Sequence, residues 1–181
     1  MTRTAFSLHP TPIGEVLVVV SDDGLVALRV LDGPDDDALA ELGHALGAFP
    51  SPDDEATASV AAQLDEYFAG VRRDFELALD WRLVHGFTRE ALEAVCEIPY
   101  GETASYGEVA ITAGRPRAHR AVGTACARTP MSIVVPAHRV VRADGSIGGY
   151  GATPEHKRFL LDLEARVLAG SPGEPSNPSG V

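Results

Sequence analysis

The sequence predicts two units, an α/β domain in the first half and a mainly α domain with a helix-turn-helix in the second. Apolar residues alternate with turn residues over the first thirty positions, helical spacing dominates from Phe87 onward, and charge is divided unequally between the halves. We place the domains at 1–84 and 85–169. A proline-, glycine- and serine-rich tail at 170–181 is expected to be disordered.

Turn residues divide the first domain into short elements. Proline, glycine and aspartate separate three apolar stretches, which predicts consecutive strands. Two helical segments follow, and Asp35–Asp37 begins the first while Gly70 stops the second. The expected elements are strands at 6–9, 16–20 and 25–30, helices at 35–46 and 55–68, and a candidate further strand at 75–79.

The second domain begins with an amphipathic helix at 87–96. Ser105 then caps a helix over 106–113, Gly114–Pro116 makes a tight turn, and the helical pattern resumes at 117–128. Two short helices joined by a glycine-containing turn are typical of a helix-turn-helix. The second of them carries arginines and the small residues Ala121, Gly123 and Ala125, which let a backbone approach a groove; an ordinary helical corner is the alternative. A last helix at 154–168 brings Glu164 back toward the core.

The segment Ile133–Val141 carries the strongest chemical hint. An apolar strand ends at Pro136, and the next residue is projected with little freedom because proline fixes φ. A reactive enzyme would carry a nucleophile at that position, with His138 beside it as base or water-holder. Here the position is Ala137, so the same segment also fits a buried strand with an incidental His-Arg pair.

Charge is distributed very unevenly along the chain. The net charge is −11, and residues 1–85 hold 5 Arg and 16 Asp/Glu, whereas residues 86–181 hold 10 of each sign. Val109–Ala143 contains no acidic residue. Its six arginines are Arg115, Arg117, Arg120, Arg128, Arg139 and Arg142. A positive patch of this kind favours a nucleic acid, with a small anionic ligand as the alternative.

Several other classes of protein are excluded by what the sequence lacks. No apolar run reaches membrane-spanning length and no signal peptide precedes the first strand, so we expect a cytoplasmic protein without membrane contact. Cys96 and Cys126 have no metal-binding spacing, which predicts a reduced protein without metal or cofactor. The glycine-rich loop 145–151 lacks the pattern of a phosphate cradle and is expected to form a pocket wall.

The second domain resembles the O6-alkylguanine-DNA alkyltransferases along nearly its whole length, with motifs in the order and spacing of that family. The matching motifs are Pro99–Thr103, Ser105–Gly107, Arg120–Gly123, Ile133–Val141 and Gly149–Gly151. The first domain is similar to the family only through Pro12–Gly14 and its strand order. The resemblance implies a ribonuclease-H-like first domain and a second domain that binds double-stranded DNA in the minor groove and flips an alkylated base.

The resemblance also implies roles for individual residues. Arg120 would fill the gap left in the base stack, and Tyr106 would crowd the 3′ phosphate. His138 would hold the water linked to the reactive thiol, Glu164 would orient His138, and Arg139 would brace the segment internally. The remaining DNA contacts would be Ala121, Gly123 and Arg128, and the base pocket would be Cys126, Val135, Val140, Tyr150 and Gly151.

Three departures from the family pattern change the functional prediction. The acceptor cysteine of the family is Ala137 here, and a methyl group accepts no alkyl group. Thr129 replaces an asparagine and Leu92 a tryptophan, which favours a natural lineage over a single engineered change. That lineage resembles the alkyltransferase-like proteins, which bind O6-alkylguanine without repairing it and mark it for nucleotide excision repair.

The sequence leaves three alternatives open. The first is an engineered methylated-DNA–protein-cysteine methyltransferase whose acceptor cysteine is replaced by Ala137. The second is an enzyme that transfers the alkyl group to Cys126, and the third is a sequence-specific regulator. Cys126 has no evident base beside it, and a small residue packing a helix against a strand is the favoured explanation of it. Regulators with this motif dimerise on a two-fold site, whereas no additional dimerisation helix is present, so we expect a monomer.

Overall fold

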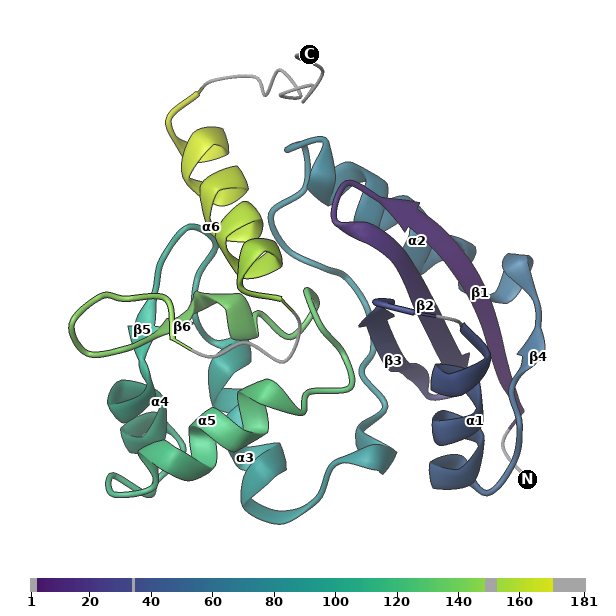
Figure 1. Ribbon diagram of the computed structural model, residues 1–181, viewed down its shortest axis with the longest axis horizontal. Coiled ribbons are helices and arrows are strands. Elements are labelled where there is room, and N and C mark those ends of the chain that lie inside the picture. The colour runs from purple at the N-terminus through teal and green to yellow at the C-terminus, as the bar shows by residue number, and fades with distance from the viewer. Residues whose placement is uncertain (1–2, 34, 149–152, 171–181) are drawn as a thin grey trace.

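The computed structural model describes residues 3–33, 35–148 and 153–170 and contains the two expected domains. The first is a mixed sheet with a helix on each face (Figure 1). The strands are in the order β3-β2-β1-β4, antiparallel except for the parallel pair β1 and β4. Its elements are β1 (Thr4–Thr11), β2 (Gly14–Ser21), β3 (Gly24–Val30), α1 (Asp35–Leu46), β4 (Ser51–Pro52) and α2 (Asp54–Phe68).

The expected strand at 75–79 is not formed. This segment runs extended beside β3 and makes one isolated bridge, Leu25 to Leu79, with Leu25 N donating to Ala78 O at 2.8 Å. Gly24 explains the close approach: its φ is +133°, and a Cβ there would lie 2.3 Å from Ala78 O. The segment pairs with β3 only at this point, so it does not become a strand of the sheet.

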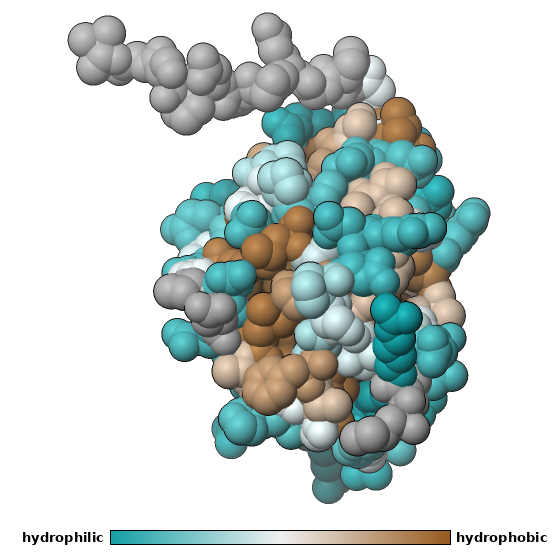
Figure 2. All heavy atoms as spheres, turned by 90° about the vertical axis from the view of Figure 1, so that its right-hand side faces the viewer, coloured by the Kyte–Doolittle hydropathy of each residue, from teal (hydrophilic) through white to brown (hydrophobic). Residues whose placement is uncertain are grey.

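The two faces of the sheet are covered unequally. α2 begins at the N-cap Asp53, whose side chain accepts from Ala56 N, and packs its apolar side against the sheet. α1 packs on the opposite face over a smaller apolar cluster, where Phe6 and Leu8 of β1 remain partly exposed. Figure 2 looks onto the side of the molecule where α1 and β4 lie and shows apolar side chains reaching the surface there.

The second domain is mainly helical, as expected. Its helical pattern begins two residues later than predicted in the second helix of the helix-turn-helix, at His119. A short 3₁₀ turn, η1 (Trp81–Leu83), ends the first domain. The elements of the second are α3 (Gly86–Cys96), β5 (Ala104–Ser105), α4 (Tyr106–Thr112), α5 (His119–Ala127), η2 (Ala137–Arg139), β6 (Val140–Val141) and α6 (Pro154–Leu168). Among the described residues, no helix is both long and apolar enough to cross a membrane.

One continuous apolar core joins the two domains. Its members include Val18, Leu28, Leu64 and Tyr67 from the first domain and Leu92, Val122, Met131, Val135 and Leu160 from the second. Backbone hydrogen bonds cross the same boundary, because Leu28 N donates to Pro130 O at 2.8 Å and Ser132 N donates to Leu28 O at 2.9 Å. The first domain therefore contacts the segment that leads to the candidate site.

Candidate functional site

The segment 133–141 does not form the strand that the sequence predicted. Ile133 has a φ of +70°, and short backbone bonds (Val134 N to Ser132 O, Val135 N to Met131 O) fold the chain into consecutive turns. A 3₁₀ turn, η2, follows, and only β6 is strand, paired in parallel with β5. A continuous apolar run indicates burial but not conformation, which is why the prediction was wrong.

His138, expected beside the projected position as a base or water-holder, is completely buried. Its Nε2 lies 2.8 Å from Oε1 of Glu164, which α6 carries back into the core as expected. Burial lowers the pKa of His138, and the hydrogen bond and charge of Glu164 only partly oppose this. Nδ1 of His138 has no hydrogen-bond partner among the described residues. The site therefore holds a neutral imidazole with one nitrogen bonded to a carboxylate.

Arg139 is also buried, so it does not belong to the predicted positive surface patch. Its Nε and Nη2 donate to Glu164 at 2.9 to 3.2 Å, and Nη1 donates to Ile98 O at 2.7 Å. Burial acts to raise the pKa of Glu164, but hydrogen bonds from His138 and Arg139 outweigh it and lower the pKa to about 2. Glu164 is therefore a charged carboxylate, and Arg139 links it to the end of the α3 region.

The residues expected to form the base pocket share one region of the core. Cys126, Val135, Ala137 and Val140 are all buried and belong to the same apolar cluster. Tyr150 and Gly151, the other two predicted members, lie outside the described residues. The methyl group of Ala137 is next to His138 in the chain and 1% exposed.

Sequence reasoning missed Lys157 and Tyr67. Lys157 is buried on α6, donates to Val140 O, and lies 5.9 Å from the centre of the Tyr106 ring. Burial lowers the pKa of Lys157 to about 8 and raises that of Cys126 to about 11, although the charge of Lys157 acts against the second shift. Spacing offers a signal for Lys157, because it lies three and seven residues before Leu160 and Glu164 on the buried face of α6.

Tyr67 belongs to the first domain, yet its hydroxyl reaches the site. Its Oη donates to Glu164 Oε1 at 2.8 Å and lies 3.5 Å from His138 Nε2. A tyrosine at helical spacing on α2 reads as a core residue, so no sequence signal distinguishes the hydroxyl from the ring. This contact joins the two domains inside the site.

The helix-turn-helix presents an exposed surface with the expected residues. Ser105 and Glu108 form a reciprocal capping box at the start of α4, with bonds of 3.2 and 2.7 Å. An open cleft of about 400 Å³ is lined by Tyr106, His119, Arg120, Gly123 and Thr124. Ala121 is exposed on the same helix, whereas Ala125 is buried in the core and is not available to a groove.

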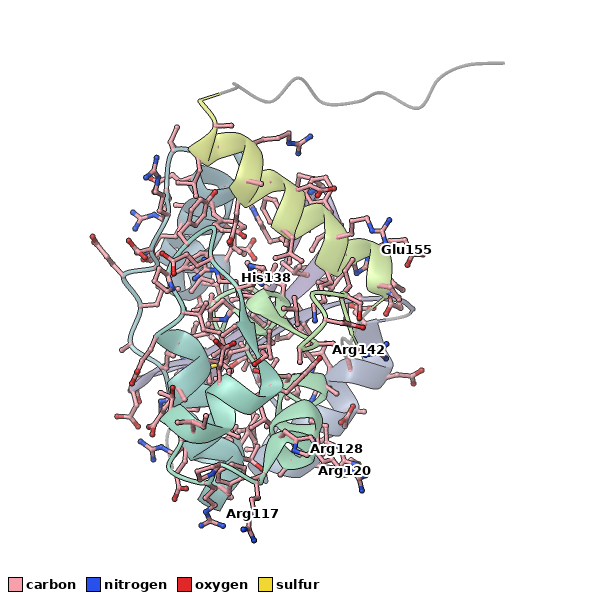
Figure 3. All side chains as sticks on the ribbon, turned by 90° about the vertical axis from the view of Figure 1, so that its left-hand side faces the viewer. Arg117, Arg120, Arg128, His138, Arg142 and Glu155 are labelled. Atoms are coloured by element: carbon pink, nitrogen blue, oxygen red, sulfur yellow. The ribbon has the colours of Figure 1, made fainter. Side chains whose placement is uncertain are left out.

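Five arginines remain exposed, and we call them the arginine surface. They are Arg115, Arg117, Arg120, Arg128 and Arg142. Figure 3 shows Arg117, Arg120 and Arg128 projecting outward, whereas His138 lies inside the domain. Arg115 differs from the others, because it lies 3.8 Å from Glu90 and 4.9 Å from the centre of the Phe87 ring.

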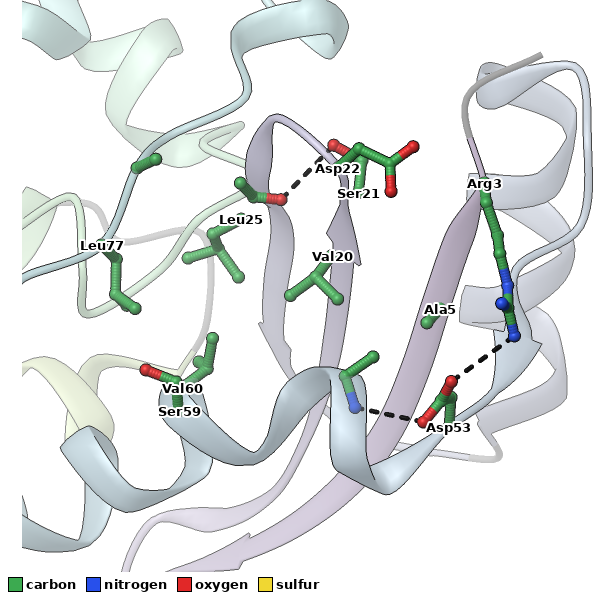
Figure 4. Close-up of a pocket in the computed structure, with 13 residues that line it drawn as sticks. Arg3, Ala5, Val20, Ser21, Asp22, Leu25, Asp53, Ser59, Val60 and Leu77 are labelled. Carbon is green, nitrogen blue, oxygen red and sulfur yellow. Dashed lines mark hydrogen bonds and ion pairs between the residues drawn. The ribbon is translucent and has the colours of Figure 1, made fainter.

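A separate pocket of about 300 Å³ lies in the first domain between the end of the β2–β3 hairpin and α2 (Figure 4). Asp53 at its rim is 3.6 Å from Arg3 and already caps α2, so these polar groups bond within the domain. Among the described residues no cluster of His, Cys, Asp or Glu has the arrangement of a metal site. The buried ionisable side chains that bond to one another are instead Tyr67, His138 and Arg139, which all contact Glu164.

A ribonuclease-like α/β domain joined to a helix-turn-helix domain defines the two-domain class of DNA alkyltransferases. Residues 5–81 match the family model of the 6-O-methylguanine DNA methyltransferase ribonuclease-like domain. Residues 86–166 match that of the 6-O-methylguanine DNA methyltransferase DNA binding domain. The chain belongs to the O6-methylguanine DNA methyltransferase family, which confirms the resemblance and the fold class expected from the sequence.

Relatives and solved structures agree with this assignment. The chain is 36% identical to a methylated-DNA–protein-cysteine methyltransferase of Methanosarcina barkeri, over 90% of this chain and 98% of that protein. It is 46% identical to the Mycobacterium bovis protein of the same name, over 63% of this chain and 68% of that protein. The O6-methylguanine methyltransferase of Mycobacterium tuberculosis superposes with a TM-score of 0.77 at 34% identity, over 96% of each chain. The structure of the same organism's protein in complex with DNA superposes with a TM-score of 0.76 at 35% identity, over 94% of this chain and 96% of that one.

Proposed function

We propose that this chain binds O6-alkylguanine in double-stranded DNA without accepting the alkyl group, as part of DNA repair. The observation that carries the proposal is Ala137 beside a complete His138–Glu164 pair. A methyl group offers no nucleophile, whereas the pair that would serve one is kept. A pocket that retains its polar frame and lacks the acceptor is suited to holding a lesion.

The helix-turn-helix supplies the DNA contact in this proposal. α5 enters the minor groove, Arg120 fills the gap left by the flipped base, and Tyr106 crowds the 3′ phosphate. Ala121 and Gly123 allow close approach, and Arg128 contacts the backbone. The exposed position of Arg120, Ala121 and Arg128, the cleft that Tyr106 and Gly123 line beside them, and the DNA complex of the Mycobacterium tuberculosis relative support this docking.

The flipped base is received next to Ala137. Cys126, Val135 and Val140 form its apolar wall, and Tyr150 and Gly151 are assigned to the pocket from their motif. The burial of these three residues in the same apolar core as Ala137, with Val135 and Val140 within three residues of it in the chain, supports the assignment. The chain acts as a monomer that marks the lesion for nucleotide excision repair proteins.

Transfer to Cys126 is the first alternative, and its electrostatics count against it. Burial raises the pKa of this thiol to about 11 even with Lys157 nearby. The thiolate fraction at pH 7 is then on the order of 10⁻⁴, and the thiolate is the reactive form. An engineered replacement of an acceptor cysteine at Ala137 is the second alternative, and the native gene at this codon distinguishes it.

The test compares duplexes with one O6-methylguanine and with guanine at the same position. We expect preferential binding to the first and an unchanged intact protein mass after incubation. Cys126→Ser removes the alternative acceptor, so a mass gain that occurs in the wild type and is lost in this variant would identify Cys126 as the acceptor. A methyl group mapped to Cys126 supports the enzyme alternative, and equal affinity for both duplexes, or preference for a promoter sequence, contradicts lesion recognition.

A further inference from the structure

The first domain contributes a polar group to the buried site through Tyr67. This residue is in the last turn of α2 and is completely buried. Its ring packs against Phe68, Phe75 and Tyr100 at centroid distances of 5.3 to 6.1 Å, whereas its hydroxyl leaves this cluster and bonds to Glu164. Packing accounts for the ring but not for the direction of the hydroxyl.

The hydrogen bonds of Glu164 fix where the protons are. Oε1 accepts from Tyr67 Oη at 2.8 Å, His138 Nε2 at 2.8 Å and Arg139 Nη2 at 2.9 Å. Oε2 accepts from Arg139 Nε at 3.0 Å and Gly101 N at 2.9 Å. A carboxylate only accepts, so Tyr67 donates and the proton of the neutral imidazole is on Nε2. Nδ1 of His138 is then an acceptor.

A second contact from the first domain holds the opposite side of the site. Leu28 in β3 bonds through its N–H and C=O to Pro130 and Ser132, in the turn just before Ile133. Ile133 has a positive φ, which a β-branched residue adopts only when its surroundings enforce it. The backbone that leads to Ala137 is therefore anchored on the first domain.

We propose that Tyr67 is a positioning residue through which the first domain shapes the lesion site. Its phenol fixes Glu164, and Glu164 in turn fixes His138 with Nδ1 as an acceptor beside Ala137. The effect on His138 is a property of the free protein. Only the effect on DNA binding rests on the function proposed above.

The charges around His138 determine the direction of the expected change. Glu164 and Tyr67 face Nε2 from α6 and α2, and Arg139 and Lys157 add positive charge. The pKa of His138 is lowered by burial, opposed by Glu164, and lowered further by the two cations. The phenol proton withdraws part of the charge on Oε1, so its removal strengthens the attraction of Glu164 for an imidazolium and raises the pKa of His138.

Tyr67→Phe removes the hydroxyl and keeps the ring, and Tyr100→Phe is its matched control. The hydroxyl of Tyr100 is buried in the same aromatic cluster and has no hydrogen-bond partner among the described residues. Both variants therefore lose one buried hydroxyl, but only the first loses a bond to Glu164. Urea unfolding verifies that both variants are folded.

The decisive measurement is the ¹⁵N NMR signal of the His138 ring in the full chain without DNA. We expect Nδ1 to be unprotonated in the wild type, and the titration of His138 in Tyr67→Phe to move upward by about half a pH unit or more. Tyr100→Phe should match the wild type. If Tyr67→Phe leaves the ring signals and titration of His138 unchanged, Tyr67 serves only to pack the core and the proposal is wrong.

Lesion affinity gives the second arm of the test. We expect Tyr67→Phe to weaken binding to the O6-methylguanine duplex about three- to tenfold relative to the guanine duplex. This is part of the effect of one hydrogen bond to a charged group, because Tyr67 acts on the lesion only through Glu164 and His138. Tyr100→Phe should not change this ratio. A wild type without lesion preference overturns the proposed function and leaves the NMR result valid, whereas an unchanged ratio in Tyr67→Phe overturns the link from Tyr67 to the lesion.

Discussion

Glu164 receives hydrogen bonds from three separate parts of the chain: α2, the backbone at Gly101, and the His138–Arg139 pair. A buried carboxylate is tolerated only when such donors replace water. Arg139 supplies the opposite charge, and the neutral donors satisfy the remaining lone pairs. At the scale of single residues, the site is thus a buried anion, and the free energy of unfolding of the protein depends on whether Glu164 is ionised.

The first prediction concerns acid stability. The pKa of Glu164 is lowered to about 2 in the folded chain from an ordinary value of 4.5, so its stabilising contribution is present above pH 4.5 and is lost as the pH falls toward 2. We expect Glu164→Gln to flatten the fall in unfolding free energy over this range. Urea unfolding at a series of pH values measures this fall in the free energy of unfolding for the wild type and the variant.

The control for this measurement is Glu155→Gln on the same helix. Glu155 is exposed at the start of α6 (Figure 3), so its variant should follow the wild-type curve. Glu164→Gln should also be less stable at pH 7, by about 3 to 5 kcal/mol, because Arg139 is left without its anion. A variant with the wild-type acid slope would show that Glu164 is not the titrating group.

Restoring the acceptor is the second prediction at this scale. In Ala137→Cys the new thiol stands beside His138, whose Nδ1 is free of protein partners among the described residues. We expect transfer of the methyl group from O6-methylguanine, measured as a gain in intact mass. Transfer should be about a hundredfold slower than in an ordinary family member, because misplacement by about an ångström costs that much.

Thr129 is the reason to expect such misplacement. Its Oγ1 accepts from Met131 N at 3.4 Å, a long bond in the turn that leads to Ala137. A rate equal to that of the Mycobacterium tuberculosis relative, measured side by side, would indicate an intact enzyme with an engineered alanine. A variant that binds the lesion but never gains mass would indicate a pocket rebuilt for recognition.

At the scale of elements, α4 and α5 differ in how they begin. α4 has a capping box, whereas α5 begins at Ala118 without a side-chain cap, immediately after the turn. The first turn of α5 thus exposes backbone N–H groups together with Arg120, next to the cleft shared with Tyr106. An uncapped, basic helix start is suited to contact with phosphates.

The element prediction compares two arginines of the helix-turn-helix. We expect Arg120→Ala to weaken lesion binding about tenfold more than Arg115→Ala, because Arg120 lines the cleft whereas Arg115 is held by Glu90 and Phe87. Fluorescence anisotropy at one salt concentration measures both. Equal losses would argue that no side chain replaces the flipped base.

The elements also show what the sequence reveals and what it hides. The hairpins, α2 and the capped α4 follow from turn residues, apolar spacing and the Ser105 cap, and all are confirmed. The conformation of Ile133–Val135 could not be predicted, because it depends on bonds from Leu28, a hundred residues earlier in the chain. The His138–Glu164 contact was implied by the family resemblance, whereas the hydroxyl of Tyr67 had no signal.

At the scale of the whole molecule, the acidic first domain and the arginine surface divide the charge. The chain carries −11 in total, yet the five arginines of the arginine surface lie in one segment, Val109–Ala143, that itself contains no acidic residue. Binding to DNA therefore depends on a local field rather than on net charge. Salt screens the repulsion from the acidic domain as well as the attraction of the arginines.

The whole-molecule prediction is the salt dependence of binding. If the five arginines neutralise phosphates, the slope of log K against log salt should be about −4.5. Arg117→Ala should reduce its magnitude by about 0.9, whereas Arg29→Ala in the first domain, where Arg29 pairs with Glu41, should not change it. A slope near zero would show that the arginine surface does not face the DNA.

The core that runs through both domains has a consequence for how the protein folds and fails. Because Leu28, Tyr67, Met131 and Val135 are members of one apolar cluster, neither half completes its interior alone, and we expect the chain to melt in a single cooperative transition. Slow amide exchange should then extend from the central strands into the turn at Pro130–Ser132. A substitution that disorders the sheet at Leu28 would therefore also disorder the turn that leads to Ala137, although Leu28 and Ala137 lie in different domains.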